Sequence, residues 1–330
     1  MAKPLDLYPS EVVSQTVTLG VLMALLLASA PAGAQQTAAP ADQPQVIFRA
    51  GVEAVSISAS VRTEGGKVVR DLARADFEVL DSGRPVTIRD FYAGESAISL
   101  GILLDISGSM AIGGNMERAR EAMGMVTMSL RDGQDEATLF TFDSSLRQVF
   151  NYTSELSTVH RLNLTGKPWG ITSLYDAIGD SARSVAKRSN RHRALLVLTD
   201  GVDTNSRLTA AQVSSIASSI DVPVYLLVVV NPADHPGGEF EALATADRQT
   251  QQASLVDLAR WTGGDTMFAS VPSHTSVAVQ GLMAELRHQY LITFEPGERA
   301  GWHPLEVRTR KKNLVVHARG GYMAGPRTGS

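Results

Sequence analysis

Hydrophobic and polar positions follow three different patterns along the chain. Between residues 46 and 94, apolar and polar residues alternate, as in VEAVSISASV, which is typical of half-buried strands. Between residues 96 and 289, apolar runs such as Ile98–Leu104 alternate with stretches whose apolar residues recur at helical spacing. From 290 to 324, short strands return, separated by Gly, Pro and Asn. The patterns predict an α/β block with β-rich segments on both sides.

The fold class we expect is α/β, with a Rossmann-like, mostly parallel sheet and helices on both of its faces, because buried strands alternate with amphipathic helices. This central domain spans residues 96–289. We expect the flanking segment 290–324 to pair with 46–94 in one small β-sandwich. The helical spacing predicts helices over residues 115–130, 174–187, 209–220, 255–261 and 277–289.

The first 34 residues have the pattern of an export signal. Val17–Ala30 is mainly apolar but short for a membrane span, and Ala32-Gly33-Ala34 supplies small residues for cleavage. We therefore expect a signal peptide at 1–34, a linker at 35–45, and a secreted or periplasmic protein. The weak positive charge before the apolar run leaves two alternatives open. The true start lies downstream, or the segment stays as an uncleaved anchor, which would be the one membrane attachment.

The composition of the chain excludes several kinds of partner and site. Hydrophobic residues make up 44 % of its 330 residues and charged residues 19 %, as in ordinary globular proteins. The formal net charge of −4 is too small to imply a nucleic-acid partner. The chain has no cysteine, which excludes disulfides, thiolate metal sites, a cysteine nucleophile and a lipid-anchoring cysteine.

Small oxygen-bearing side chains follow the buried strands of the central block. In LLDISGSM, the apolar run ends in Asp105, and Ser107 and Ser109 follow at alternate positions. Asp200 ends the strand ALLVLTD, and Thr172 lies in the loop PWGITSLYDAI just before a helix. Binding sites in open α/β sheets form at the carboxyl ends of strands, near the point where strand order reverses. If the three loops are adjacent there, they present two carboxylates and three hydroxyls around one point.

This donor set suits Mg²⁺, which prefers hard oxygen ligands in near-octahedral geometry and retains waters. Hydroxyls add ligands without adding charge, and an open position remains for an outside ligand. Each motif alone is typical of a turn or a helix cap, but their combination and order favour a cation site. The donors do not separate Mg²⁺ from Mn²⁺ or Ca²⁺.

The motifs DISGSM, TSLYD and LTDG stand in the order of the metal-ion-dependent adhesion site of von Willebrand factor type A domains. The resemblance covers about residues 96–283. It implies that a partner protein supplies an Asp or Glu carboxylate to the sixth position. Ile171 stands where glycine is common in the family. The resemblance implies direct ligation by Ser107, Ser109 and Thr172, and ligation directly or through water by Asp105 and Asp200.

The flanking segments are similar to those of bacterial exported proteins of the VWFA-related type. The stretches that carry this resemblance are LARADFEVLDSGRPVTIRDF before the central domain and LRHQYLITFEP with the strands after it. The molecular function of those proteins is mostly unestablished, so this resemblance implies an architecture more than a role.

Three functions are compatible with these features. The first is a secreted, non-enzymatic module that binds a protein partner through the cation. The second is a structural or assembly protein whose metal site is unused. The third, and least favoured, is a Mg²⁺-dependent phosphoester hydrolase, since the sequence has no phosphate-cradling glycine-rich loop, no DxD at Asp105 and no suitably placed lysine or histidine for acid–base chemistry.

Other residues near the motifs have more than one interpretation. Asp143 either hydrogen-bonds the metal ligands or caps a turn. Asp176 is expected to be an acidic residue in the first turn of a helix, where it interacts favourably with the helix dipole. Asp203 orients the Asp200 loop or, as we favour, only stabilises its turn. We expect Trp169 to pack against the protein, with a partner-facing position as the alternative, and we expect His192 in a solvated loop.

Overall fold

The computed structural model describes residues 54–160, 166–230, 246–297 and 299–325. The expected signal peptide and linker, residues 1–45, lie outside these ranges. The described residues belong to one compact unit, 50–330.

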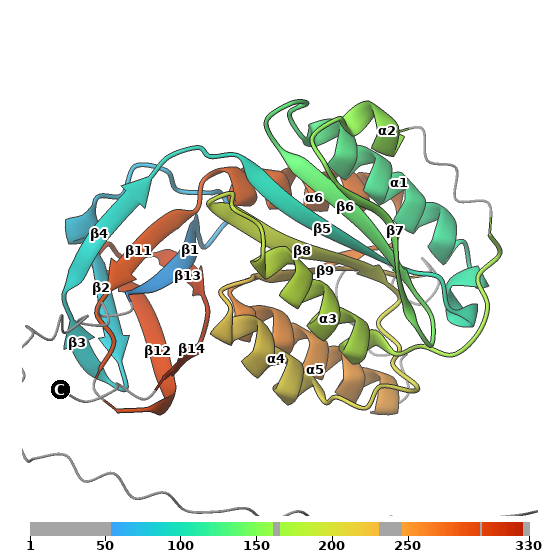
Figure 1. The fold of residues 1–330 in the computed structure, drawn as a ribbon. Helices are drawn as coiled ribbons and strands as arrows, with labels where there is room; N and C mark the ends of the chain where they lie inside the picture. The colour runs from blue at the N-terminus through green and yellow to red at the C-terminus, as the bar shows by residue number, and fades with distance from the viewer. Residues whose placement is uncertain (1–53, 161–165, 231–245, 298, 326–330) are drawn as a thin grey trace, which may run out of the picture. The chain divides into compact units, whose positions relative to one another are not determined.

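A six-stranded sheet forms the centre of the α/β block, in the order β10-β9-β8-β5-β6-β7 (Figure 1). All neighbouring strands are parallel except β6 and β7, which are antiparallel. The strands are β5 (Ile98–Asp105), β6 (Glu136–Phe142), β7 (Leu146–Thr153), β8 (His192–Thr199), β9 (Val224–Val229) and β10 (Thr266–Ala269).

The strand order reverses between β5 and β8. From β5 the chain continues to β6 on one side, whereas β8, β9 and β10 follow one another on the other side. The parallel register aligns Leu104 of β5 with Leu198 of β8. Consequently Asp105 and Thr199, the last residues of the two strands, lie at the same edge of the sheet, where ligand sites form in this class of fold.

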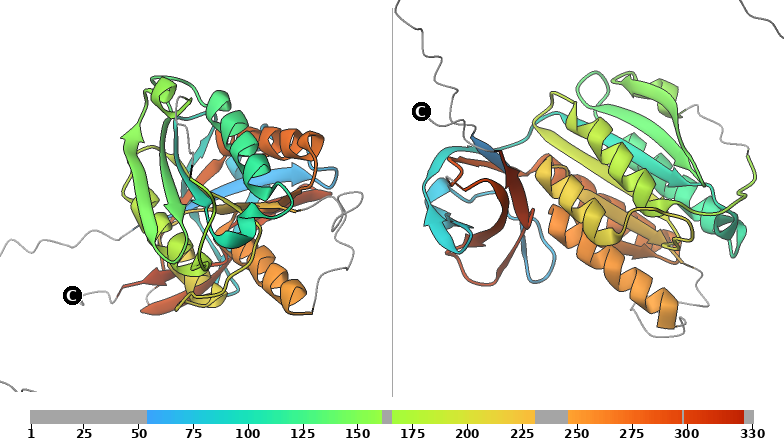
Figure 2. Two further views of the ribbon diagram at one scale, coloured as in Figure 1. Left: turned by 90° about the vertical axis from the view of Figure 1, so that its right-hand side faces the viewer. Right: turned by 60° about the horizontal axis from the view of Figure 1, so that its bottom comes forward.

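Helices cover both faces of the sheet, as the sequence predicts (Figures 1 and 2). One buried cluster includes residues from α1, α2 and α6, and a second, on the other face, includes residues from α3, α4 and α5. No helix in the described ranges is both long and apolar enough to cross a membrane. The helices are α1 (Asn115–Ser129), α2 (Leu156–His160), α3 (Leu174–Ala186), α4 (Ala210–Ser219), α5 (Ala246–Thr262) and α6 (Pro272–Arg287).

Two helices begin earlier than their apolar spacing indicates. Helix α6 begins at Pro272 rather than at Val277, because proline at the first helical position loses no hydrogen bond. Helix α5 begins at Ala246 rather than at Leu255, and its first half, ADRQTQQAS, has no apolar stripe to predict it.

The flanking segments form two antiparallel four-stranded sheets, as expected for the fold class, with the orders β13-β1-β11-β4 and β14-β12-β2-β3. Strand β11 lies between β1 and β4, and β12 pairs with β2, so both sheets combine N-terminal and C-terminal strands. Their shared core includes Ile57, Phe77, Ile292 and Phe294. The strands are β1 (Val55–Thr63), β2 (Phe77–Asp81), β3 (Arg84–Val86), β4 (Ile88–Ala93), β11 (Tyr290–Phe294), β12 (Gly301–Thr309), β13 (Leu314–Ala318) and β14 (Gly321–Ala324).

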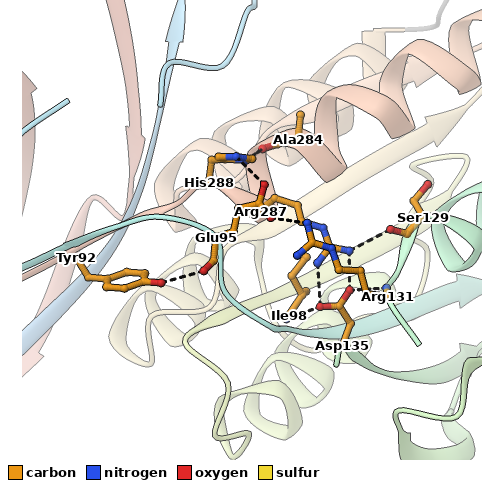
Figure 3. A network of polar contacts seen from close by, with 9 residues as sticks. All are labelled: Tyr92, Glu95, Ile98, Ser129, Arg131, Asp135, Ala284, Arg287 and His288. Carbon is orange, nitrogen blue, oxygen red and sulfur yellow. Dashed lines mark hydrogen bonds and ion pairs between the residues drawn. The ribbon is translucent and has the colours of Figure 1, made fainter. Parts of the chain in front are cut away.

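A buried ion pair lies where the chain enters and leaves the central domain (Figure 3). Arg287, the last residue of α6, donates two hydrogen bonds to Asp135, of 2.9 and 2.6 Å. Asp135 is fully buried and also accepts the backbone N–H groups of Ile98 at 2.9 Å and Arg131 at 2.6 Å. One carboxylate therefore fixes the start of β5, the turn before β6 and the end of α6.

Another buried polar group lies in the β-sandwich. Asp81 and His303 are both buried, and the His303 Nδ1 lies 2.8 Å from the Asp81 carboxylate. The His303 Nε2 lies 2.6 Å from the carbonyl oxygen of Arg299, and the Tyr322 hydroxyl donates to Asp81 at 2.7 Å. Because both imidazole nitrogens face acceptors, this geometry suits the protonated ring.

The pKa values of this group shift in the directions that an ion pair requires. Burial opposes the charge on His303, but the hydrogen bonds to Arg299 and Asp81 and the charge of Asp81 raise its pKa above the ordinary 6.5. Burial also opposes ionisation of Asp81, but hydrogen bonds from Tyr322, His303 and Ser82 hold its pKa below 3.8.

Asp135→Asn should strongly destabilise the protein, because it leaves the buried guanidinium of Arg287 without a counter-charge. We expect a loss of about 3–5 kcal/mol in the free energy of unfolding, measured by urea denaturation. The control is Asp180→Asn, which removes an exposed carboxylate paired with Arg183 and should leave the midpoint nearly unchanged. A small loss for Asp135→Asn would show that the pair does not hold the junction.

The stability contributed by His303 should decrease with increasing pH. Because its folded pKa is raised, the contribution is complete below the ordinary pKa of 6.5 and is lost as the pH rises through the folded value. Thermal unfolding between pH 6 and 9 should show a steeper decline for the wild type than for His303→Asn. Parallel profiles for the two proteins would contradict a charged His303.

Candidate metal centre

Asp105 ends β5 with both carboxylate oxygens engaged. One oxygen accepts the backbone N–H of Ser107 at 2.9 Å, and the other accepts the hydroxyl of Thr199 at 2.7 Å. The side chain of Asp105 has no exposed surface. These bonds fix the orientation of the carboxylate between the ends of β5 and β8.

The two serines lie together in the turn after β5. Ser107 is buried, and its Oγ lies 3.2 Å from the Oγ of Ser109. A short 3₁₀ helix, Gly108–Ala111, places them. Gly108 leaves the two loops close together: its N–H donates to the carbonyl of Gly170 at 3.0 Å, and an added Cβ would make a tight contact of 3.2 Å with that oxygen.

The Thr172 loop is held on both sides by backbone hydrogen bonds. On one side, the Trp169 N–H donates to the carbonyl of Ile106 at 2.9 Å, beside the serine turn. On the other side, the Thr172 N–H donates to the Thr204 hydroxyl at 2.9 Å, and the Thr172 carbonyl accepts the Thr204 N–H at 3.0 Å. Thr172 itself is buried. The loops that follow β5 and β8 are thus joined through the loop that precedes α3.

Asp200 directly follows β8 and is partly buried. Its carboxylate accepts the Val202 N–H at 3.3 Å, which closes the turn of its own loop. Asp203, farther along the loop, accepts the N–H of Leu174 at 2.8 Å and the Ser206 hydroxyl at 2.6 Å. Asp203 therefore connects the Asp200 loop to the first residue of α3 and does more than stabilise a turn.

The electrostatics of the centre favour a cation. Burial raises the pKa of Asp105 to about 6, with hydrogen bonds from Ser107 and Thr199 opposing the shift and the charge of Asp200 adding to it. A divalent cation would stabilise the ionised form of both carboxylates. Among the described residues, no group of three or more His, Cys, Asp or Glu could hold a metal, so a cation here would depend on hydroxyl ligands. The donors present therefore fit Mg²⁺ or a similar hard ion, and their assignment as ligands stays a prediction.

Thr199 is the residue of the centre that the sequence analysis does not identify. It hydrogen-bonds Asp105 through its hydroxyl, which also accepts the N–H of Gly201 at 3.0 Å. Thr199 could be predicted only by aligning β5 with β8, because it is the last residue of β8 and lies beside Asp105, the last residue of β5. Thr204 is likewise visible only once the loops are placed.

The other acidic residues near the motifs stabilise loops. Asp143 accepts the Ser145 N–H at 2.9 Å and pairs with Arg147 at 2.5 Å, which is the turn role considered from the sequence. Asp176, in the first turn of α3, accepts the backbone N–H groups of Arg207 and Leu208 at 3.1 and 2.8 Å. It therefore holds the loop before α4 in addition to its place at the helix start.

Two expectations from the sequence are wrong. Trp169 does not pack against the protein, since 84 % of it is exposed. His192 is not in a solvated loop: it begins β8 and is fully buried, and burial lowers its pKa to about 4. The charged neighbours Arg191 and Arg193 suggest an exposed loop in the sequence, although β8 already begins at His192.

A comparison of the sequence with known families finds one match, within the central domain. Residues 100–202 match the family model of the von Willebrand factor type A domain. The match confirms the type A resemblance over this range, which contains all five candidate ligands. No curated protein matches the chain in sequence.

Solved structures of similar fold include bacterial proteins. BatB from Bacteroides thetaiotaomicron is 19 % identical with a TM-score of 0.45, over 57 % of this chain and 99 % of that one. An aerotolerance-related membrane protein from Bacteroides fragilis is 18 % identical with a TM-score of 0.43, over 58 % and 98 %. A von Willebrand factor type A protein from Catenulispora acidiphila is 13 % identical with a TM-score of 0.44, over 72 % and 74 %. At these identities and TM-scores, the likenesses carry no argument about function.

Mg²⁺ or Mn²⁺ should stabilise the wild-type protein against urea, because a ligand that binds only the folded state adds about 2.7 kcal/mol at one hundred times its Kd. Asp105→Asn should abolish this gain, because it removes one of the two carboxylates. Asp180→Asn, an exposed carboxylate on α3, should retain it. An equal gain in Asp105→Asn and the wild type, or no gain in the wild type with either ion, would contradict a metal centre here.

Proposed function

We propose that this chain is a secreted or periplasmic adhesion or interaction module that binds a protein partner through a divalent cation, and that it is not an enzyme. The observation that supports the proposal most is the position of Asp105. It is a buried carboxylate with a raised pKa, at the reversal of strand order, in a turn whose serine hydroxyls lie together. A cation at this edge would relieve the cost of that charge.

The chemistry of binding follows from the ligand types. Ser107, Ser109 and Thr172 would bind the ion directly, and Asp105 and Asp200 would hold it directly or through water. The bound ion supplies a Lewis-acidic position for an outside oxygen. An Asp or Glu carboxylate of the partner suits that position, because it is a hard, charged oxygen ligand.

Export is part of this proposal because contact with a partner in the periplasm or outside the cell requires it. The apolar run and the small residues at 32–34 support cleavage after Ala34. The mature chain would then begin with the linker at 35–45 and continue into the β-sandwich and the type A domain, 96–289.

A structural or assembly protein with an unused metal site is the alternative, and a cation-dependence measurement separates the two. Immobilised wild-type chain should retain proteins from the cell envelope of the source organism in Mg²⁺ and release them in EDTA. The variants Asp105→Ala and Ser107→Ala/Ser109→Ala should retain none of them, because each removes ligands of the ion.

The control is Met128→Ser, which changes an exposed side chain on α1 outside the candidate centre and should retain the same proteins. If the wild type in EDTA and Asp105→Ala in Mg²⁺ both retain as much protein as the wild type in Mg²⁺, the structural alternative is supported. Mg²⁺-dependent turnover of p-nitrophenyl phosphate that Asp105→Asn abolishes would instead support the hydrolase.

A further inference from the structure

Three large apolar side chains are exposed in the loops that carry the candidate ligands. Ile112 is 66 % exposed, Trp169 84 % and Ile171 51 %. We call these three residues the apolar rim. Single exposed apolar residues are ordinary on protein surfaces, but a tryptophan at this exposure beside a candidate binding centre calls for a function.

The backbone of the apolar rim is fixed against the candidate centre. The Ile112 N–H donates to the carbonyl of Ser109 at 3.1 Å, and the Trp169 N–H donates to the carbonyl of Ile106 at 2.9 Å. Ile171 directly precedes Thr172, whose backbone is held by Thr204. The rim side chains are thus exposed on anchored loops, so that docking against them would cost little backbone entropy.

The position of the rim points to one kind of occupant. Successive Cα atoms are about 3.8 Å apart, so residues one to three positions from a ligand lie within reach of a partner segment that supplies the ligand's oxygen. A partner carboxylate bound to the ion would bring the side chains next to it within reach of the loops that carry the rim. Tryptophan buries a large apolar area with few rotatable bonds, which makes it a common anchor of protein interfaces.

We propose that the apolar rim selects partner segments in which the metal-binding Asp or Glu has a bulky apolar side chain one or two positions away. This inference rests on the proposed function, because it assumes that a carboxylate occupies the ion. It adds the chemical class of the partner segment: an acidic residue with an aliphatic or aromatic neighbour.

A random-peptide library displayed on phage tests this directly. Selection on the immobilised full chain in Mg²⁺, with elution by EDTA, should enrich peptides with an acidic residue beside Leu, Ile, Phe or Trp. Selection on Trp169→Ser/Ile171→Ser should still enrich the acidic residue and lose the apolar neighbour. Met128→Ser, another exposed apolar side chain, should enrich the same peptides as the wild type.

The affinity of one enriched synthetic peptide gives the second measurement. Replacing its apolar residue by Ser should weaken binding to the wild type roughly 30-fold, as for loss of an interface anchor worth about 2 kcal/mol. The same replacement should have little effect on binding to Trp169→Ser, because the partner of that side chain is already absent. Mg²⁺ binding to Trp169→Ser, measured by calorimetry, should equal that of the wild type.

The outcomes separate this inference from the proposed function. Two results would overturn the inference and leave the proposed function in place. In the first, the enriched peptides are acidic but have no preferred apolar neighbour. In the second, they have one, and Trp169→Ser/Ile171→Ser enriches the same peptides. Enrichment that is insensitive to EDTA and has no acidic residue overturns both. Trp169-dependent binding to phosphatidylcholine vesicles in EDTA would assign the rim to a lipid surface, and Trp169-dependent dimerisation would assign it to a second copy. Either result would overturn the inference.

Discussion

The ion pair between Arg287 and Asp135 is the constraint on which the arrangement of the chain depends. The chain enters the central sheet at Ile98 and leaves α6 at Arg287, and Asp135 binds both points. Near it, Glu95 pairs with His288 at 3.2 Å, so the incoming and outgoing segments are also joined by side chains. Buried charges are costly unless every hydrogen-bonding group is satisfied, and here each Asp135 oxygen has a guanidinium and a backbone N–H. The pair thus joins the two points at which the segments of the sandwich meet the central domain.

Periodicity predicts most of the fold because burial on one or both sides of an element determines where apolar residues recur. The parallel strands β5, β8 and β9 are buried on both faces, and their apolar runs identify them without further information. The first half of α5 has no such stripe, so its sequence carries no signal for a helix. Helix α2 is a five-residue element, too short for a periodic pattern. Neither element has an apolar period from which a helix could be predicted.

Some residues of the candidate centre are likewise predictable from the sequence, and others are not. Asp105, Ser107 and Ser109 are predictable because they are close in the chain and follow one strand. Thr199 is not, since its contact with Asp105 depends on two strands being neighbours in register. Trp169 shows the opposite limit: an aromatic residue in a short loop suggests packing, whereas its 84 % exposure shows that the side chain lies largely in solvent.

The balance of charge explains why hydroxyls rather than carboxylates complete the candidate centre. In the proposed complex, Asp105 and Asp200 together match the two positive charges of the ion. Burial is the main cause that raises the pKa of Asp105, and the charge of Asp200 adds to it. A third carboxylate from this chain would add further repulsion. Ser107, Ser109 and Thr172 instead supply oxygen without charge, so the centre does not become negative and would not repel an anionic group from outside. The apolar rim then has a distinct role, because charge alone would accept any exposed carboxylate, whereas Trp169 and Ile171 can discriminate among the residues beside it.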